Sequence, residues 1–164
     1  MNSGDPPSVL VMGIGNPDRG DDGVGPAVVG RLRNRVPTGV SVLERGGDAL
    51  ALLDNWEGFS TVILVDAVAP ISEPGRVHRL DLAQNPLPLN FAPCSTHAFG
   101  LAETVELARS LRKLPSSLGA YLVEGEQFET GAQLSPAIGK AVDEVAERIL
   151  AEIASLLEAR GGHA

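Results

Sequence analysis

The chain has 164 residues, of which 43% are hydrophobic and only 4% are aromatic, and its formal net charge is −8. This length predicts a single domain spanning residues 1–164, while the acidity and the scarcity of rings argue against a nucleic-acid partner. No apolar run approaches the ~20 residues of a membrane helix, no signal peptide is evident, and the only cysteine, Cys94, fits a reducing, cytoplasmic compartment.

The first half of the chain alternates strand patterns with helix patterns. Residues 8–14 are predicted to form a buried strand, followed by a glycine-rich loop and by a helix from about Asp22 to Arg35. Residues 39–45 alternate as a second strand, and residues 48–56 form a short helix. Residues 61–68 are a third, fully apolar strand with Asp66 at its end. Apolar strands of this kind are typical of the centre of a parallel sheet.

The second half continues this alternation around a long loop. Residues 75–82 are predicted to form a strand at the edge of the sheet, and a proline-rich loop occupies residues 83–96. A helix is expected from His97 to about Lys113, and a fifth strand over residues 119–125. A last helix opens at Ser135-Pro136 and ends before Gly161-Gly162. Together these elements predict a three-layer α/β sandwich.

The glycine-rich loop, "GIGNPDRGDDGVGP", raises the question of what it binds. It lacks the third glycine of a dinucleotide fingerprint and the Gly-Lys-Ser/Thr end of a P-loop. Its adjacent carboxylates, Asp21 and Asp22, would also repel a phosphate. A phosphate site is therefore disfavoured, and a cation site is favoured.

Three potential metal ligands lie where strands and helices meet. Asp22 follows the first strand, Asp66 ends the third, and His97 begins the helix after the long loop. The carboxyl ends of neighbouring strands border the ligand crevice of an open α/β sheet, and two carboxylates with one imidazole suit a divalent metal with open positions. Each residue also has a structural alternative, since Asp22 could cap a helix, Asp66 could cap a turn, and His97 could simply begin its helix.

Two further residues are less favoured as parts of a site. His78 lies in an alternating strand and is predicted to be exposed. Cys94, three residues before His97, could be imagined as a nucleophile, but a small buried filler is the preferred interpretation.

Several segments together resemble one protein family. These are "GIGNPDRGDDGVGPAVV", "RGGDALALL", "VILVDAV", "STHAFGLAETVELA" and "LSPAIGKAVDEVAERIL". They are similar to the hydrogenase maturation endopeptidases, in family order, from about Val9 to Leu157. The resemblance implies a phosphorylase/hydrolase-like α/β/α sandwich, with a five-stranded mixed sheet of order 2-1-3-5-4 in which strand 4 is antiparallel.

The resemblance also implies a function and a site. Members remove a C-terminal peptide from the nickel-loaded precursor of the large subunit of a nickel–iron hydrogenase. By this resemblance Asp22, Asp66 and His97 are both the metal ligands and the catalytic residues of a metal-dependent peptide hydrolase. The nickel would be carried by the substrate, another divalent metal could substitute for it, and the protein would be a cytoplasmic monomer. Asp21 is assigned to orienting the loop.

Two alternatives remain beside this function. A non-catalytic chaperone that binds nickel or the large subunit would use the same ligands. Peptidyl-tRNA hydrolases share the glycine turn and the broad fold, but they continue with residues that are absent here, and the acidity of the chain opposes a tRNA substrate.

Overall fold

A computed structural model describes residues 8–46, 48–88, 91 and 101–161. Its elements are, in chain order, β1 (Val9–Ile14), the 3-10 turn η1 (Gly20–Gly23), α1 (Val24–Leu32), β2 (Val40–Arg45), α2 (Ala49–Trp56), β3 (Thr61–Val68), β4 (Val77–Asp81), α3 (Leu101–Ser110), β5 (Ser117–Glu124) and α4 (Pro136–Gly161). Each strand predicted from the sequence is present, and so is each helix, with shifts of a few residues at several ends.

The strands form one mixed sheet of order β2-β1-β3-β5-β4. β1 pairs in parallel with β2 and β3, β3 pairs in parallel with β5, and β4 runs antiparallel to β5. The expected strand order and the antiparallel fourth strand are confirmed. As a result, the carboxyl ends of β1, β3 and β5 and the beginning of β4 lie at one edge of the sheet, which we call the carboxyl edge.

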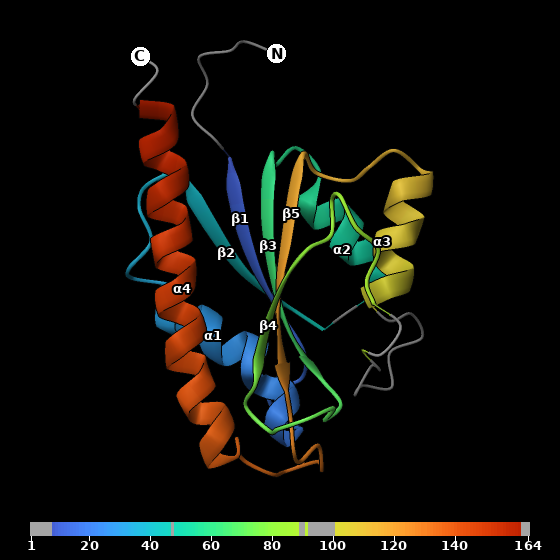
Figure 1. The fold of residues 1–164 in the computed structure, drawn as a ribbon, viewed down its shortest axis with the longest axis vertical. Coiled ribbons are helices and arrows are strands. Elements are labelled where there is room, and N and C mark those ends of the chain that lie inside the picture. Colours follow the sequence, from blue (N-terminus) through green and yellow to red (C-terminus); the bar gives the residue numbers. More distant parts are fainter. Residues whose placement is uncertain (1–7, 47, 89–90, 92–100, 162–164) are drawn as a thin grey trace.

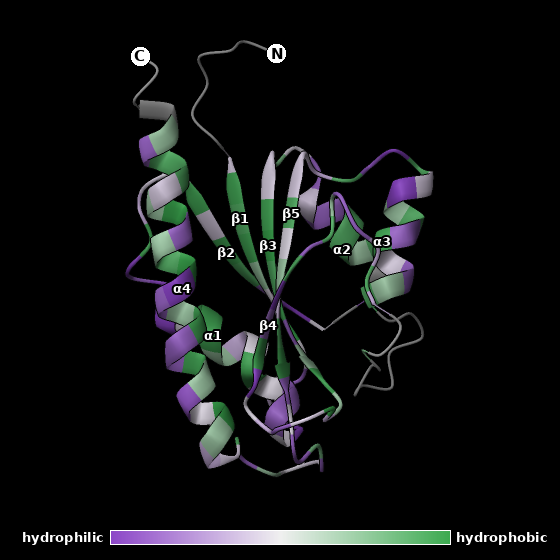
Figure 2. Ribbon diagram, in the orientation of Figure 1, coloured by the Kyte–Doolittle hydropathy of each residue, from purple (hydrophilic) through white to green (hydrophobic). Residues whose placement is uncertain are grey.

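Helices cover both faces of this sheet (Figure 1). α1 and α4 pack together on one face, and α2 and α3 pack together on the other. Alternate residues of the central strands serve the two resulting cores. In β1, for example, Val9 and Val11 face the α1/α4 side, whereas Leu10 and Met12 face the α2/α3 side. This double burial explains why β1 is apolar throughout and why β3 is apolar except for Thr61 and Asp66 (Figure 2).

Two helices end earlier than predicted. α1 stops at Leu32 rather than near Arg35, and the chain continues in turns in which the N–H groups of Arg35 and Val36 bond to the carbonyl oxygen of Leu32. α3 stops at Ser110, and Arg112 adopts a left-handed φ of 56° just beyond it. Leu111 was predicted on the apolar face of this helix, but it is 51% exposed.

The other differences at element ends are small. β5 begins at Ser117, two residues before the predicted start, and α4 runs to Gly161 instead of ending before it. Within the described residues, no helix combines the length and the apolarity that crossing a bilayer requires.

Candidate functional site

Glycines bring the loop after β1 directly onto the ends of the central strands. A Cβ atom at Gly25 would lie 2.5 Å from the carbonyl oxygen of Ile14 and 2.7 Å from that of Val65. Gly15 has a φ of +137°, and a Cβ there would lie 1.9 Å from the carbonyl oxygen of Asp22. These close backbone contacts allow η1 to sit at the carboxyl edge and place its two aspartates there.

Asp21 is fully buried, and its carboxylate is saturated by its own chain. Oδ1 accepts a hydrogen bond from the backbone N–H of Ser135 at 2.7 Å. Oδ2 accepts from the N–H groups of Glu126 at 2.8 Å and Gln127 at 2.9 Å, and from the Ser135 hydroxyl at 2.8 Å. Asp21 therefore ties the loop after β1 to the segment between β5 and α4, which agrees with its predicted role in orienting the loop.

Asp22 is also buried, with 1% of its surface exposed, but its carboxylate is only half satisfied. Oδ2 accepts from the backbone N–H of Asn16 at 2.9 Å, whereas Oδ1 has no hydrogen-bond partner in the described structure. The side chain does not cap α1, whose N-cap is Gly23. An unpaired buried oxygen costs about 1–3 kcal/mol, so this atom is a candidate for contact with a ligand.

Asp66 projects from β3 beside Asp22. Its Oδ1 accepts a 2.8 Å hydrogen bond from the adjacent N–H of Ala67, which lies within the strand, so it does not cap a following turn. Burial raises the pKa of Asp66 well above its ordinary range, and the negative charge of Asp22 raises it further. A bound cation relieves the repulsion between two neighbouring carboxylate charges.

The third predicted ligand, His97, lies outside the described residues, and so does Cys94. In the described ranges, no group of three or more metal-ligating side chains is found. The structure thus brings Asp22 and Asp66 together, while the place of His97 stays a prediction.

One interpretation of a single residue is wrong. His78 was predicted to be exposed, but only 22% of its side chain is accessible, because its Nε2 lies 2.7 Å from the carboxylate of the buried Glu124. Glu124 was not singled out from the sequence. The available signal was a carboxylate at the end of the otherwise apolar strand β5.

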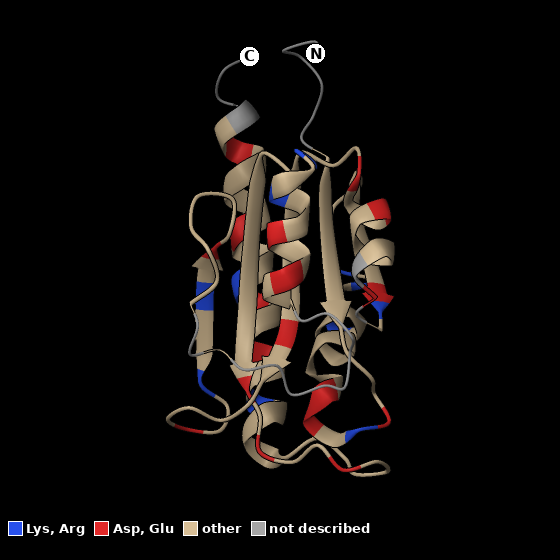
Figure 3. Ribbon diagram, turned by 90° about the vertical axis from the view of Figure 1, so that its right-hand side faces the viewer, with Lys and Arg blue, Asp and Glu red and all other residues tan. Residues whose placement is uncertain are grey.

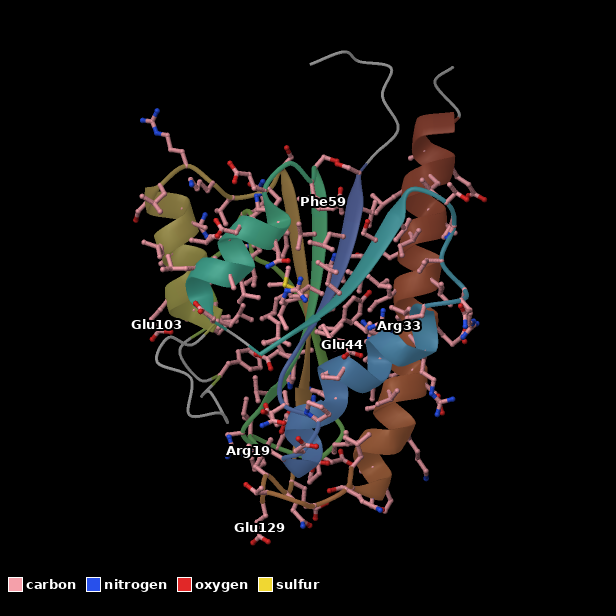
Figure 4. The ribbon with its side chains drawn as sticks, turned by 180° about the vertical axis from the view of Figure 1, so that it is seen from behind. Arg19, Arg33, Glu44, Phe59, Glu103 and Glu129 are labelled. Carbon is pink, nitrogen blue, oxygen red and sulfur yellow. The ribbon has the colours of Figure 1, made fainter. Side chains whose placement is uncertain are left out.

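The loops around the carboxyl edge carry more acid than base. Figure 3 shows acidic segments on several of these loops, and Figure 4 shows Arg19 and Glu129 at the same end of the molecule. The exposed acidic residues are Asp18, Glu73, Glu126 and Glu129, set against the basic residues Arg19 and Arg76. Such a rim attracts cations toward Asp22 and Asp66.

Comparisons of the sequence with known proteins identify one family. The sequence model of a family described as hydrogenase maturation protease matches residues 26–152. The hydrogenase 2 maturation protease of Escherichia coli K12 is 28% identical over 88% of this chain and 90% of its own length.

Solved structures give the same result. The hydrogenase maturating endopeptidase HybD from E. coli superposes with a TM-score of 0.73 at 25% identity, covering 90% of this chain and 92% of its own. The NiFe hydrogenase maturation protease HycI from Thermococcus kodakarensis KOD1 superposes with a TM-score of 0.70 at 26% identity and the same coverage.

Proposed function

This chain belongs to the hydrogenase maturation protease family, and we propose that it cuts a C-terminal peptide from the nickel-loaded precursor of a NiFe hydrogenase large subunit. In this proposal the nickel arrives with the substrate and docks on Asp22, Asp66 and His97. The protein works as a cytoplasmic monomer, and its partner is that precursor.

The observation that carries the proposal is the unpartnered, buried Oδ1 of Asp22 beside Asp66. Hard carboxylate oxygens and a borderline imidazole form a donor set that nickel and other divalent metals accept. Because Asp21 is already saturated by hydrogen bonds, it has no free oxygen for this purpose, and only the second aspartate of the pair is available.

The arrangement supports two contributions to cleavage. The carboxylates hold the metal-bearing part of the precursor at the carboxyl edge, which places the adjacent peptide bond on the acidic rim. When bound, the metal acts as a Lewis acid that polarises a carbonyl or lowers the pKa of water.

The test is mass spectrometry of a nickel-loaded large-subunit precursor after incubation with the protein. We expect the wild type to shorten the precursor by one C-terminal peptide. Asp22→Asn, Asp66→Asn and His97→Ala should each leave it uncut, because each removes one ligand of a shared ion. Asp54→Asn changes an exposed carboxylate of α2, outside the acidic rim, and should cut at the wild-type rate.

A non-catalytic chaperone is the second candidate, because recognition and cleavage would use the same ligands. It predicts that the wild type binds the nickel-loaded precursor but never changes its mass. That result would replace the protease proposal.

A further inference from the structure

A second polar cluster lies at the carboxyl edge and has no part in the proposed metal site. Its centre is Glu124, the last residue of β5, which is fully buried. Oε1 accepts hydrogen bonds from the backbone N–H groups of Ile71 at 2.7 Å, Ser72 at 2.6 Å and Glu73 at 3.0 Å. Oε2 accepts from the Ser72 hydroxyl at 3.1 Å and lies 2.7 Å from Nε2 of His78.

These contacts fix the charge of Glu124. Burial would raise the pKa of this carboxyl, but the hydrogen bonds from His78, Ser72, Ile71 and Glu73 outweigh it and lower the pKa to about 2. The carboxylate is therefore ionised at neutral pH, and it can only accept hydrogen bonds.

An ionised partner in turn fixes the tautomer of His78. Nε2 must carry the proton that it donates to Glu124, so in the neutral ring Nδ1 is unprotonated and holds a lone pair. No group in the described part of the chain hydrogen-bonds to Nδ1. The ring packs edge-on against Phe91, with centroids 4.9 Å apart, and it is 22% exposed. The structure thus holds an oriented basic nitrogen on a partly exposed ring.

The strand register places this imidazole on the same face as the candidate metal site. Asp66 lies opposite Leu122 in the β3/β5 pair, and Leu122 lies opposite His78 in the β4/β5 pair. Residues directly opposite one another share a face of the sheet, so the three form one row. Two strand spacings separate Asp66 from His78, or about 10 Å between backbones. Leu122, which is fully buried, fills the row between these two side chains.

We propose that His78, oriented by Glu124, is the general base of the peptide cleavage, an inference that rests on the proposed protease function. Nδ1 takes a proton from water while the water oxygen forms a bond to the carbonyl carbon of the scissile peptide. As the carbon–nitrogen bond breaks, the imidazolium returns the proton to the leaving amine. Glu124 stabilises the imidazolium between these two steps, as a buried carboxylate does in a Ser-His-Asp triad.

The test uses His78→Gln, because a glutamine amide can still donate to Glu124 from near the Nε2 position but offers no lone pair in place of Nδ1. We expect unchanged precursor binding and an unchanged melting temperature, with a 10²–10⁴-fold slower single-turnover cleavage, the usual contribution of a general base. If the pair only holds the loop at residues 71–73, His78→Gln will cut at close to the wild-type rate, and the assignment is overturned.

Two controls separate this inference from the proposed function. If the wild type cleaves the precursor and His78→Gln cleaves it equally fast, only the role of His78 is overturned. If the wild type binds the precursor without cleaving it, the protease function and the role of His78 are both overturned. Independently of activity, nitrogen-15 NMR of the neutral His78 ring in the wild-type protein should show the proton on Nε2. A ring protonated at Nδ1 instead would refute the proposal. In Glu124→Gln the same signals should shift toward a mixture of tautomers, because the ionised acceptor is gone.

Discussion

The carboxyl edge holds two kinds of carboxylate. Asp21 and Glu124 accept four and five hydrogen bonds, respectively, with every donor supplied by their own chain. Asp22 and Asp66 lie at the same edge, but each has a single hydrogen bond among the described contacts, and the two repel each other. Asp21 and Glu124 tie loops to the sheet, whereas Asp22 and Asp66 accept few hydrogen bonds from the described part of the chain.

This difference separates a structural role from a functional role in residues of the same chemical type. A saturated carboxylate lowers the free energy of the folded state, whereas an unsatisfied or mutually repelling pair raises it. An unfavourable arrangement of this kind is retained where a bound ligand offsets it, which is why Asp22 and Asp66 are the candidate site. Asp→Asn and Glu→Gln substitutions keep the shape of the side chain but remove its charge, so they should reveal the difference between the two pairs of carboxylates.

The largest effect on stability is expected from comparing Asp21→Asn with Asp22→Asn. At position 21 the new amide would face backbone N–H donors, so the free energy of unfolding should fall by about 3 kcal/mol or more. At position 22 the amide can replace the unpartnered Oδ1, and the change should stay within about 1 kcal/mol. Urea denaturation at neutral pH measures both, and equal losses would contradict the distinction between the two residues.

A smaller and pH-dependent effect is expected for Glu124→Gln. Because folding lowers the pKa of Glu124 from 4.5 to about 2, its stabilisation is present above about pH 4.5 and is lost as the pH falls through about 2. The variant should be about 2 kcal/mol less stable than the wild type at pH 7, and the difference should vanish near pH 2. Urea denaturation across this range measures it, with Glu129→Gln, on an exposed loop, as the control. A difference independent of pH would rule out the ionised carboxylate as its source.

The smallest effect has the opposite sign and concerns Asp66→Asn. Folding raises the pKa of Asp66, so its charge destabilises the protein increasingly as the pH rises above its ordinary value of 3.8. The variant should be more stable than the wild type at pH 7, by about 0.5–2 kcal/mol, and should approach it at low pH. Thermal denaturation at several pH values measures this gain. A loss of stability at neutral pH would show that Asp66 is a structural residue.

Much of the fold could be predicted from local patterns. The apolar runs of β1 and β3 indicate central parallel strands, and the repeated apolar positions of α4 predict its buried face, because burial on a regular element repeats with the period of that element. The ends of helices were less predictable. α1 ends in turns after Leu32, and α3 ends just before the left-handed Arg112, and the periodicity of apolar residues does not indicate such turns.

The sequence by itself determined the strand-and-helix alternation and the presence of an acidic glycine loop, and it marked Asp22 and Asp66 as residues at strand ends. Only the tertiary structure decided which carboxylates are free. Asp21 and Asp22 are chemically identical neighbours, and the donors that saturate Asp21 come from residues 126–135, more than a hundred positions away. Likewise, His78 is a partly buried, oriented ring because β4 pairs with β5 beside Glu124. Hydrogen bonds between distant segments depend on how the strands are ordered, and no local pattern carries that information.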